Sequence, residues 1–377
     1  MEQRICKLEE LVKNNLFKNV YQGKKVFITG HCGFKGSWLS FWLKQLGANV
    51  TGYSLVNDYE KSPLNELDVD IQEINGDILD LEKLKKSIHE VNPDIIFHLA
   101  AQPLVGESYK DPLGTFQTNI MGSLNVYHAA RDCKNLKAIV SITTDKVYEN
   151  KEHIWGYREQ DPLGGKDPYS GSKAAMEIVT ASYVHSFYHL DHFGKDHNTL
   201  IATARAGNVI GGGDWSENRI IPDIMKATGN SKPVIIRKPD AIRPWQHVLE
   251  PISGYLLLGQ NLLEKKKEMA TPFNFGPRYD EQYRVRDILP IIQKNWSQVE
   301  YKFEQLENDF SESKNLKLDS MKALDTLGWS PVWEIEDTIK YTVDWYKEQL
   351  LSKKNITSEQ LDDYIKCAQA KNIVWTK

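Results

Sequence analysis

The sequence contains no long hydrophobic run. Its uninterrupted apolar stretches are the length of a strand, as in Ile95-Ile96-Phe97 and Val234-Ile235-Ile236, whereas a membrane span needs about 18 or more apolar residues. The first residues, Met1-Glu2-Gln3-Arg4, mix charges of both signs and lack the apolar core of a secretory signal. We therefore expect a chain that neither crosses a membrane nor associates with one.

Cysteine is also scarce. The four cysteines are far apart and form no C-x-x-C pair: Cys6, Cys32, Cys133 and Cys367. In a chain of 377 residues this pattern is typical of reduced thiols in the cytoplasm, and neither a disulfide framework nor a zinc site is expected. We predict that the protein needs no metal.

Neither sign of charge is in large excess. Lys and Arg total 47, Asp and Glu total 51, and the formal net charge is −4. A nucleic-acid-binding protein is usually basic overall or carries a basic stripe, so this class is not expected. Apolar residues make up 41% of the chain, which is enough for a core and excludes global disorder. The length suggests about two domains, or one large α/β unit with an appendage.

Strand and helix patterns alternate over the first half of the chain. Short β-branched or aromatic runs predict strands at 26–28, 49–55, 71–75, 95–99, 138–143 and 200–206. Helical patterns follow most of them, at 38–46, 81–91, 116–131 and 169–188. Such alternation implies right-handed crossovers and a Rossmann-type, doubly wound parallel sheet, the α/β fold class.

The domain organisation follows from where this rhythm begins and ends. We predict an N-terminal helical extension at 1–22 and a dinucleotide-binding domain at 23–208, with residues 242–270 also belonging to that domain. Most of 209–350 is predicted to form a smaller mixed α/β substrate-binding domain, and 351–377 a C-terminal helical tail. Thr357 and Gln360 have the spacing of a capping box, which would open a last helix in that tail.

A glycine-rich loop follows the first predicted strand. Its sequence, Gly30-His31-Cys32-Gly33-Phe34-Lys35-Gly36, has the spacing G-x-x-G-x-x-G. A plain strand-to-helix turn would also use glycines. After a buried strand and before a helix, however, this spacing is typical of a loop that holds a pyrophosphate at the helix N-terminus. We therefore predict an adenine dinucleotide cofactor.

Residues at the ends of other predicted strands agree with this cofactor. Asp77 and Ile78 follow the third strand, where a carboxylate could accept from the adenine amino group, and Leu99-Ala100-Ala101 end the fourth, where small residues leave room. One position disagrees. The end of the second strand usually carries an acidic residue that binds the ribose hydroxyls, but here it carries Ser54, and Asp58 is further along.

Tyr169 and Lys173 are four residues apart at the start of a predicted helix and therefore lie on one face of it. A free tyrosine has a pKa of about 10, and a neighbouring lysine cation can lower that pKa so that the tyrosine acts as a base. The same spacing occurs at Tyr21 and Lys25, which precede the first strand and would lie at the wrong end of the sheet. We therefore select Tyr169 and Lys173 as catalytic candidates.

Three further polar residues follow the fifth strand: Thr144, Asp145 and Lys146. A strand that simply ends in a polar loop would look the same. Because the carboxyl ends of parallel strands share one edge of the sheet, these side chains should face the same crevice as Tyr169. We interpret them as part of the catalytic group.

In these motifs the sequence resembles the extended short-chain dehydrogenase/reductase superfamily and, within it, the CDP-glucose 4,6-dehydratases. The glycine loop and Y-x-x-x-K are common to the superfamily, and the more specific stretches are TTDKVYEN, GGGDW and IRPWQHV. The resemblance extends from about Lys24 to Tyr346. It implies NAD as cofactor, CDP-glucose or a related nucleotide sugar as substrate, and a role in deoxysugar biosynthesis, for example of O-antigen.

The resemblance also implies residue roles. Thr144 would bind the sugar 4-hydroxyl, Tyr169 would be its base with Lys173 beside it, and Asp145 would protonate the departing 6-hydroxyl. Lys146 stands where related enzymes carry a glutamate base, so it would act as a neutral amine or only position water. Further residues would contact the cofactor, Gln102 and Asn119, or the substrate, Asn208, Arg219, Arg243 and His247.

Other functions share parts of this pattern. A nucleotide-sugar 4-epimerase has the same loop and Tyr–Lys pair but needs no acid such as Asp145. A sugar reductase that uses NADPH is compatible with Ser54, although no arginine near Ser54 would bind a 2′-phosphate. A catalytically inactive dinucleotide sensor would not need to keep the catalytic residues.

The resemblance further implies a homodimer, or a tetramer, built through the helices predicted at 116–131 and 169–188. These helices carry small and apolar residues: Met121, Ala129, Ala130, Ala174, Ala175, Ile178 and Val179. The alternative is that their faces pack only on the protein's own sheet.

Overall fold

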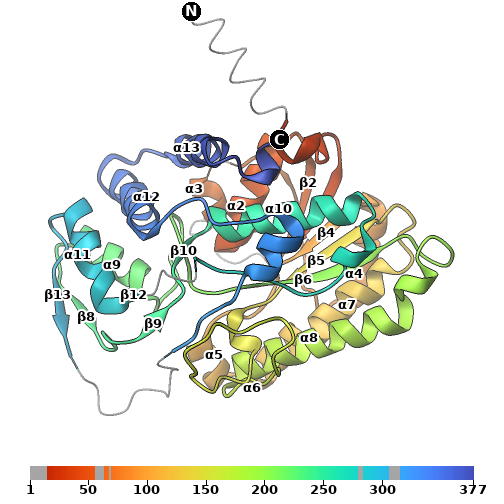
Figure 1. Cartoon of the computed structure of the whole chain (residues 1–377), viewed down its shortest axis with the longest axis horizontal. Helices are drawn as coiled ribbons and strands as arrows, with labels where there is room; N and C mark the ends of the chain where they lie inside the picture. Colours follow the sequence, from red (N-terminus) through yellow and green to blue (C-terminus); the bar gives the residue numbers. More distant parts are fainter. Residues whose placement is uncertain (1–14, 56–62, 68, 279–282, 305–314) are drawn as a thin grey trace, which may run out of the picture.

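The computed structural model describes residues 15–55, 63–67, 69–278, 283–304 and 315–377 (Figure 1). The helix expected before Leu16 and the residue Asp58 lie outside these ranges. The described part of the N-terminal extension forms a short 3-10 turn, η1 (Leu16–Asn19). No described helix is both long enough and apolar enough to cross a membrane.

A seven-stranded sheet organises the molecule, in the order β11-β6-β5-β4-β1-β2-β3. All its neighbouring strands run parallel. Its strands are β1 (Lys25–Thr29), β2 (Asn49–Ser54), β3 (Gln72–Asn75), β4 (Ile95–His98), β5 (Ala138–Ile142), β6 (Leu200–Ala206) and β11 (Phe273–Phe275). This topology confirms the predicted doubly wound α/β fold. The sequence pattern did not reveal β11, which pairs with β6 from far along the chain.

The alternation of side chains along each strand explains why both faces of this sheet are covered. Phe27 and Ile96 point to the face under α4, α7 and α8, whereas Val26, Ile28 and Phe97 belong to the core under α2 and α10. Because both faces are apolar, the strands are almost continuously hydrophobic, as parallel strands usually are. The helices that cover the two faces are visible in Figure 1.

Some helices of the first half have recognisable start signals. Asp80 caps α4 and Asp167 caps α8 by accepting from backbone N–H groups, and Pro168 occupies the first turn of α8. The bounds are α2 (Phe34–Gln45), α3 (Pro63–Glu66), α4 (Leu81–Val91), α5 (Val105–Lys110), α6 (Pro112–Phe116), α7 (Gly122–Ala130) and α8 (Pro168–Phe187), with the short 3-10 turns η4 (Asp145–Val147) and η5 (Leu190–His192).

The helix predicted at 116–131 begins earlier than expected. Asp111 caps α6, and a π-helical turn, η3 (Gln117–Met121), joins α6 to α7, so that helical structure continues from Pro112 to Ala130. The extra residue of a π turn is often found at functional sites. Asn119, one of the predicted cofactor contacts, lies within it.

After β6 the chain forms three small two-stranded sheets beside the carboxyl edge of the main sheet. The elements are β7 (Val209–Ile210), α9 (Ile220–Gly229), β8 (Val234–Ile236), β9 (Ile242–Arg243), β10 (Gln246–His247), β12 (Tyr283–Arg284), α11 (Val285–Asn295) and β13 (Tyr301–Phe303). Between them, α10 (Leu249–Leu263) packs on β5 and β6, and η6 (Lys267–Met269) leads to β11. The proposed division into two domains is compatible with this arrangement and remains a prediction.

The C-terminal elements are η7 (Ala323–Leu327), α12 (Ile335–Lys347), η8 (Glu348–Ser352), α13 (Thr357–Ala370) and η9 (Val374–Thr376). The predicted last helix is present, but the predicted capping box is wrong. Thr357 is already inside α13, its N–H donates to Asn355, and its hydroxyl accepts from the Trp345 indole. Tertiary contacts therefore use the two side chains that the sequence assigned to the cap, since Gln360 donates to the Tyr341 carbonyl.

Candidate active site

The polar candidates meet where β1, β4, β5 and β6 end. The strand order reverses between β1 and β4, and ligands of open α/β sheets bind at such a switch point. Gly30 follows β1, Leu99 follows β4 and Thr144 comes soon after β5. The second Tyr–Lys match lies elsewhere, because the Tyr21 hydroxyl donates to the Leu256 carbonyl inside the core, at 2.6 Å.

The glycine loop has the close backbone contacts that its spacing predicts. Gly30 has a φ of +77°, and a side chain on it would lie 2.6 Å from the Ala100 nitrogen. A side chain on Gly36 would collide with the Gly30 carbonyl. Both positions therefore need glycine, because the loop packs against the end of β4 and against its own helix.

The start of α2 fits a pyrophosphate. No side chain caps this helix, whose N-cap is the exposed Gly33, so the N–H groups of its first turn point toward the crevice without a side-chain acceptor. Such an N-terminus is a ready anion site. The loop and helix thus have the backbone geometry and the donor chemistry that a dinucleotide requires.

His31 does not lie in the crevice, contrary to the expectation that it contacts the cofactor. Its side chain is only 1% exposed and packs under Gly52 of β2. Its Nδ1 is 3.1 Å from the Ser54 hydroxyl, and its Nε2 is 2.8 Å from a carboxylate oxygen of Glu73. The imidazole is buried because β2 offers no side chain at Gly52 to exclude it.

Glu73 is a residue that the sequence analysis missed. It lies on β3, next to Gly52 in the register with β2, and its contact with His31 connects it to Ser54. The missing carboxylate at the end of β2 is therefore partly replaced by one from the neighbouring strand. Only the pairing of β2 with β3 could reveal this, since 19 positions separate Ser54 from Glu73 in the sequence.

The other predicted cofactor contacts differ in how free their side chains are. Asp77 accepts from the Leu79 N–H at 2.9 Å, and Ile78 packs against Gly122. The Gln102 amide bonds to Leu104 in its own loop and donates to the Thr115 hydroxyl on α6. Asn119 is fully buried and connects the Gln102 backbone to the Ser172 hydroxyl, so it ties the end of β4 to α8. Leu99, Ala100, Ala101 and Phe34 remain partly exposed at the crevice.

Tyr169 and Lys173 lie on the first turns of α8, and both are buried. Lys173 donates to the Ile142 carbonyl at 3.3 Å, so it contacts the end of β5. Burial, together with the nearby Lys35 cation, lowers the pKa of Lys173 to about 7. Burial raises the pKa of Tyr169 to about 12, although a hydrogen bond with Thr144 acts in the other direction. Burial therefore outweighs the expected lowering of the tyrosine pKa by lysine.

Thr144 connects the two groups expected to move protons. Its hydroxyl donates to Asp145 at 3.0 Å and shares a hydrogen bond with Tyr169. Burial raises the pKa of Asp145, while the charges of Lys146, Arg243 and Lys35 draw it down. The second oxygen of Asp145 is buried and has no hydrogen-bond partner within the described ranges. A carboxyl group held in this way keeps a proton to higher pH than usual and suits a general acid.

Cationic side chains surround Asp145. Lys35, at the start of α2, is near Asp145, and desolvation together with the Arg219 cation lowers the pKa of Lys35 to about 8. Arg219 forms an ion pair with Asp214 at 2.9 Å and lies near Tyr169. Arg243 is brought to Asp145 by its neighbour Pro244, which packs against Gly207. This excess of positive charge suits a diphosphate.

Asn208 and His247, both predicted to contact the substrate, differ in their position relative to the crevice. Asn208 follows β6 at the crevice, where its carbonyl accepts from the Gln246 N–H. His247 does not reach the crevice, because it is fully buried between the rings of Trp38 and Trp333. Its side chain has no exposed surface, and its role as a substrate contact stays a prediction.

Comparisons with known proteins agree with this geometry. A family model described as GDP-mannose 4,6 dehydratase matches residues 27–342. The CDP-glucose 4,6-dehydratase of Salmonella typhimurium is 43% identical over 355 residues, which are 92% of this chain and 98% of that protein. A dTDP-glucose 4,6-dehydratase of Xanthomonas campestris is 24% identical over 85% of this chain and 92% of its own.

Solved structures share the fold. An epimerase from Methanothermobacter thermautotrophicus superposes with a TM-score of 0.77 at 24% identity, over 89% of this chain and 96% of that one. A UDP-glucose 4-epimerase from Thermotoga maritima gives 0.74 at 20% identity, over 86% and 99%. At such identities the superpositions establish the architecture only.

Proposed function

This chain belongs to the GDP-mannose 4,6-dehydratase family of extended short-chain dehydrogenases/reductases, and on that basis we propose that it converts CDP-glucose into CDP-4-keto-6-deoxyglucose. The observation that carries the choice of substrate is the 43% identity to a CDP-glucose 4,6-dehydratase along almost the whole of both chains. The arrangement of Tyr169, Thr144 and Asp145 supports the choice of reaction.

NAD is the proposed cofactor. The uncapped N-terminus of α2 and the close-packed glycines would hold its pyrophosphate, and Lys173 would contact the nicotinamide ribose. When bound, NAD⁺ would accept a hydride from C4 of the sugar and later return it to C6. At the end of β2 the ribose hydroxyls would meet the neutral Ser54, which is hydrogen-bonded to His31.

The side chains would divide the proton transfers. Tyr169 would take the proton of the 4-hydroxyl while Thr144 orients that hydroxyl. The resulting ketone acidifies the C5–H, and Lys146 or a water beside it would receive this proton and return it to C5 when the hydride adds to C6. Asp145 would protonate the 6-hydroxyl, which leaves as water. Tyr169 then has gained a proton and Asp145 has lost one, and the Thr144 hydroxyl that contacts both offers a route to restore them.

A substrate panel tests this proposal. The protein is incubated with NAD⁺ and, separately, CDP-, dTDP-, GDP- and UDP-glucose, and products are identified by mass spectrometry and NMR. We expect a 4-keto-6-deoxy product from CDP-glucose and none from Tyr169→Phe. A product of unchanged mass with inverted C4 would indicate an epimerase. Consumption of NADPH in a parallel incubation with NADPH in place of NAD⁺ would indicate a reductase. If no sugar were converted, the result would indicate a dinucleotide-binding protein that lacks this activity.

Cofactor exchange is a separate expectation. Replacing a direct charged contact to ribose by a neutral one could cost about 1.5–3 kcal/mol, a tenfold or greater weakening. We therefore expect dialysed protein to lose NAD⁺ and to regain activity when NAD⁺ is added, with binding followed by calorimetry. Stoichiometric NAD⁺ that survives dialysis would contradict this expectation.

We also propose a homodimer formed through α7 and α8. Of the residues expected at the interface, Ala129, Ala130 and Ala174 are buried within the protein's own core, but Met121 and Ile178 are 48% and 58% exposed. Leu113 and Phe116 of α6 and Phe187 of α8 are further exposed apolar side chains. Apolar side chains grouped in this way are typical of a protein–protein interface.

A further inference from the structure

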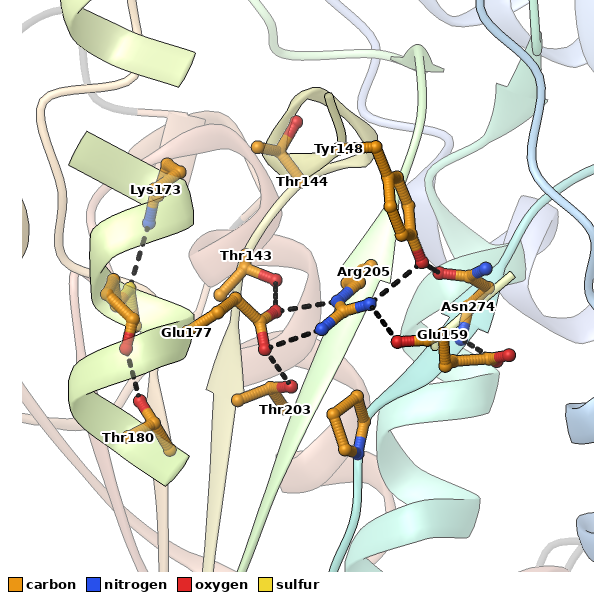
Figure 2. A network of polar contacts seen from close by, with 12 residues as sticks. Thr143, Thr144, Tyr148, Glu159, Lys173, Glu177, Thr180, Thr203, Arg205 and Asn274 are labelled. Carbon is orange, nitrogen blue, oxygen red and sulfur yellow. Dashed lines mark hydrogen bonds and ion pairs between the residues drawn. The ribbon is translucent and has the colours of Figure 1, made fainter. Parts of the chain in front are cut away.

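A buried ion pair lies directly below the catalytic residues. It joins Glu177 of α8 to Arg205 of β6, and both side chains are nearly inaccessible, at 3% and 2% exposure (Figure 2). Arg205 donates from Nε to one carboxylate oxygen at 2.8 Å and from Nη2 to the other at 2.9 Å. This bidentate geometry fixes the orientation of the carboxylate as well as its position.

Two threonines complete the coordination of Glu177. The Thr143 hydroxyl donates to one carboxylate oxygen at 2.6 Å, and the Thr203 hydroxyl donates to the other at 2.7 Å. The carboxylate therefore accepts four hydrogen bonds from β5 and β6, as Figure 2 shows. These bonds tie α8 to the ends of the two strands that border the site.

The other side of Arg205 faces the segment after Asp145. Its Nη1 donates to the Tyr148 hydroxyl at 2.8 Å and to the Glu159 carbonyl at 3.1 Å. Tyr148 in turn donates to Asn274 of β11 at 2.7 Å. The network thus connects α8 to Thr143 and Tyr148, which flank Thr144 and Asp145 in the sequence.

The network residues are neighbours of the catalytic candidates in the chain. Glu177 is four residues after Lys173, one helical turn away on the same face of α8. Thr143 precedes Thr144 directly, and Tyr148 follows Asp145 by three positions. Stability alone is a weak explanation for such a group, because buried ion pairs can often be replaced by apolar residues without loss.

We propose that Glu177 is a positioning residue for the tyrosine–lysine pair: its carboxylate, held by Arg205, Thr143 and Thr203, sets the register of α8 against β5 and β6 so that Tyr169 and Lys173 face Thr144 and Asp145. The inference rests on the proposed function in assigning Tyr169 and Lys173 to the reaction. It adds a residue that touches neither substrate nor cofactor but whose loss misplaces two that do.

The charge of Glu177 has a second effect on Lys173. The charged or titratable groups around that lysine are Lys35 from α2, Glu177 from its own helix and His98 from β4. Glu177 favours the lysine cation, and Lys35 opposes it. Loss of the carboxylate should therefore make Lys173 lose its proton at a lower pH, which a purely structural substitution would not do.

The test compares Glu177→Gln with Glu250→Gln. Glu250, on α10, is an equally buried carboxylate that accepts from the Val332 and Trp333 N–H groups and from the Tyr364 hydroxyl. In both variants a glutamine NH₂ replaces an acceptor and faces donors, and Glu177→Gln in addition takes the ion-pair partner from the buried Arg205. Only Glu177 is connected to the ends of β5 and β6 beside the catalytic residues.

For Glu177→Gln we expect kcat with CDP-glucose to fall at least tenfold with KM changed less than threefold, because a small misplacement of reacting groups mainly affects the chemical step. The alkaline limb of its kcat profile should move to lower pH. Glu250→Gln should keep kcat and the profile within twofold of the parent protein. Thermal unfolding of both variants establishes that each is folded.

Retention of kcat within twofold by Glu177→Gln would overturn the proposal, as would an equal loss in Glu250→Gln. Should Glu177→Gln not fold, Thr143→Val removes one of the four bonds and should lower kcat in the same direction, by about threefold or more. Calorimetric NAD⁺ binding needs no sugar. If the parent protein converts no nucleotide sugar, the proposed function fails, and NAD⁺ affinity then tests the positioning role by itself. A weaker NAD⁺ affinity in Glu177→Gln but not in Glu250→Gln would support that role. Equal NAD⁺ affinities in the two variants would overturn it.

Discussion

Asp145 and Tyr169 offer the sharpest test of how single residues share the reaction. Tyr169→Phe should prevent removal of the 4-hydroxyl proton, so that no NADH forms. Asp145→Asn should allow oxidation at C4 but slow the loss of water, because general-acid assistance is typically worth about 10²–10⁴-fold. Enzyme-bound NADH should then accumulate in a single turnover with CDP-glucose and be visible by its absorbance.

Two other results would change the assignment of Asp145. A nearly unchanged rate in Asp145→Asn would mean that the carboxyl group only orders the strand end. Loss of NADH formation in both variants would place Asp145 in substrate binding or in C4 oxidation instead. Its position between Thr144 and several cations is compatible with the acid role.

At the scale of elements, the start of α8 links stability to catalysis. Asp167 caps this helix by accepting from the Ser170 N–H at 2.9 Å, next to Tyr169. Asp167→Ala should lower the free energy of unfolding by about 0.5–2 kcal/mol and also lower kcat, because the first turn carries the tyrosine. Chemical denaturation and steady-state kinetics measure the two effects.

Asp80 supplies the matched control, since it caps α4 by accepting from the Lys83 N–H at 3.1 Å. Asp80→Ala should cost a similar free energy of unfolding and leave kcat unchanged, because α4 carries none of the catalytic candidates. Equal kcat values for the two variants would show that the first turn of α8 is held in place without its cap.

For the whole molecule, the exposed apolar residues of α6, η3 and α8 predict a dimer. Light scattering should give the mass of two chains, or of four if dimers pair, and Ile178→Glu should shift the protein to monomers because a charge would be buried at the interface. Ile235→Glu is the control, because Ile235 is similarly exposed, at 49%, but lies on β8 away from these helices. A monomeric parent protein would rule the interface out.

The pH dependence of unfolding is also a property of the whole molecule. Burial lowers the pKa of His98 and of His247 to about 3, against an ordinary value of 6.5. The unfolded chain therefore binds more protons between these values, so these two residues make the folded state lose stability as the pH falls from 6.5 toward 3. Each contributes up to about 1.4 kcal/mol per pH unit in that window.

His247→Phe should reduce this slope, because the aromatic slot between Trp38 and Trp333 accepts a ring that does not titrate. Burial raises the pKa of Glu250 to about 7, which acts in the opposite direction above about pH 4.5. Urea unfolding at several pH values should therefore compare His247→Phe with the parent protein and with the exposed His192→Phe. Equal slopes in all three proteins would contradict the prediction.

The sequence by itself predicted features that depend on local spacing. The parallel sheet follows from strand–helix alternation, the glycine loop from three glycines between a strand and a helix, and the Tyr169–Lys173 pair from one helical turn. Each of these signals lies within a few residues, where backbone sterics and side-chain periodicity act directly. For that reason the start and type of α4, α8 and β6 were close to the observed ones.

Only the tertiary structure decided which residues meet across elements. It turned His31 away from the crevice and toward Glu73, buried His247 between two tryptophans, added β11 to the sheet, and joined Glu177 to Arg205. None of these has a local signal, because strand pairing and helix packing bring together residues that are tens of positions apart. The polar contacts that orient the site are satisfied across those distances, since a buried carboxylate or imidazole needs a partner wherever the fold provides one.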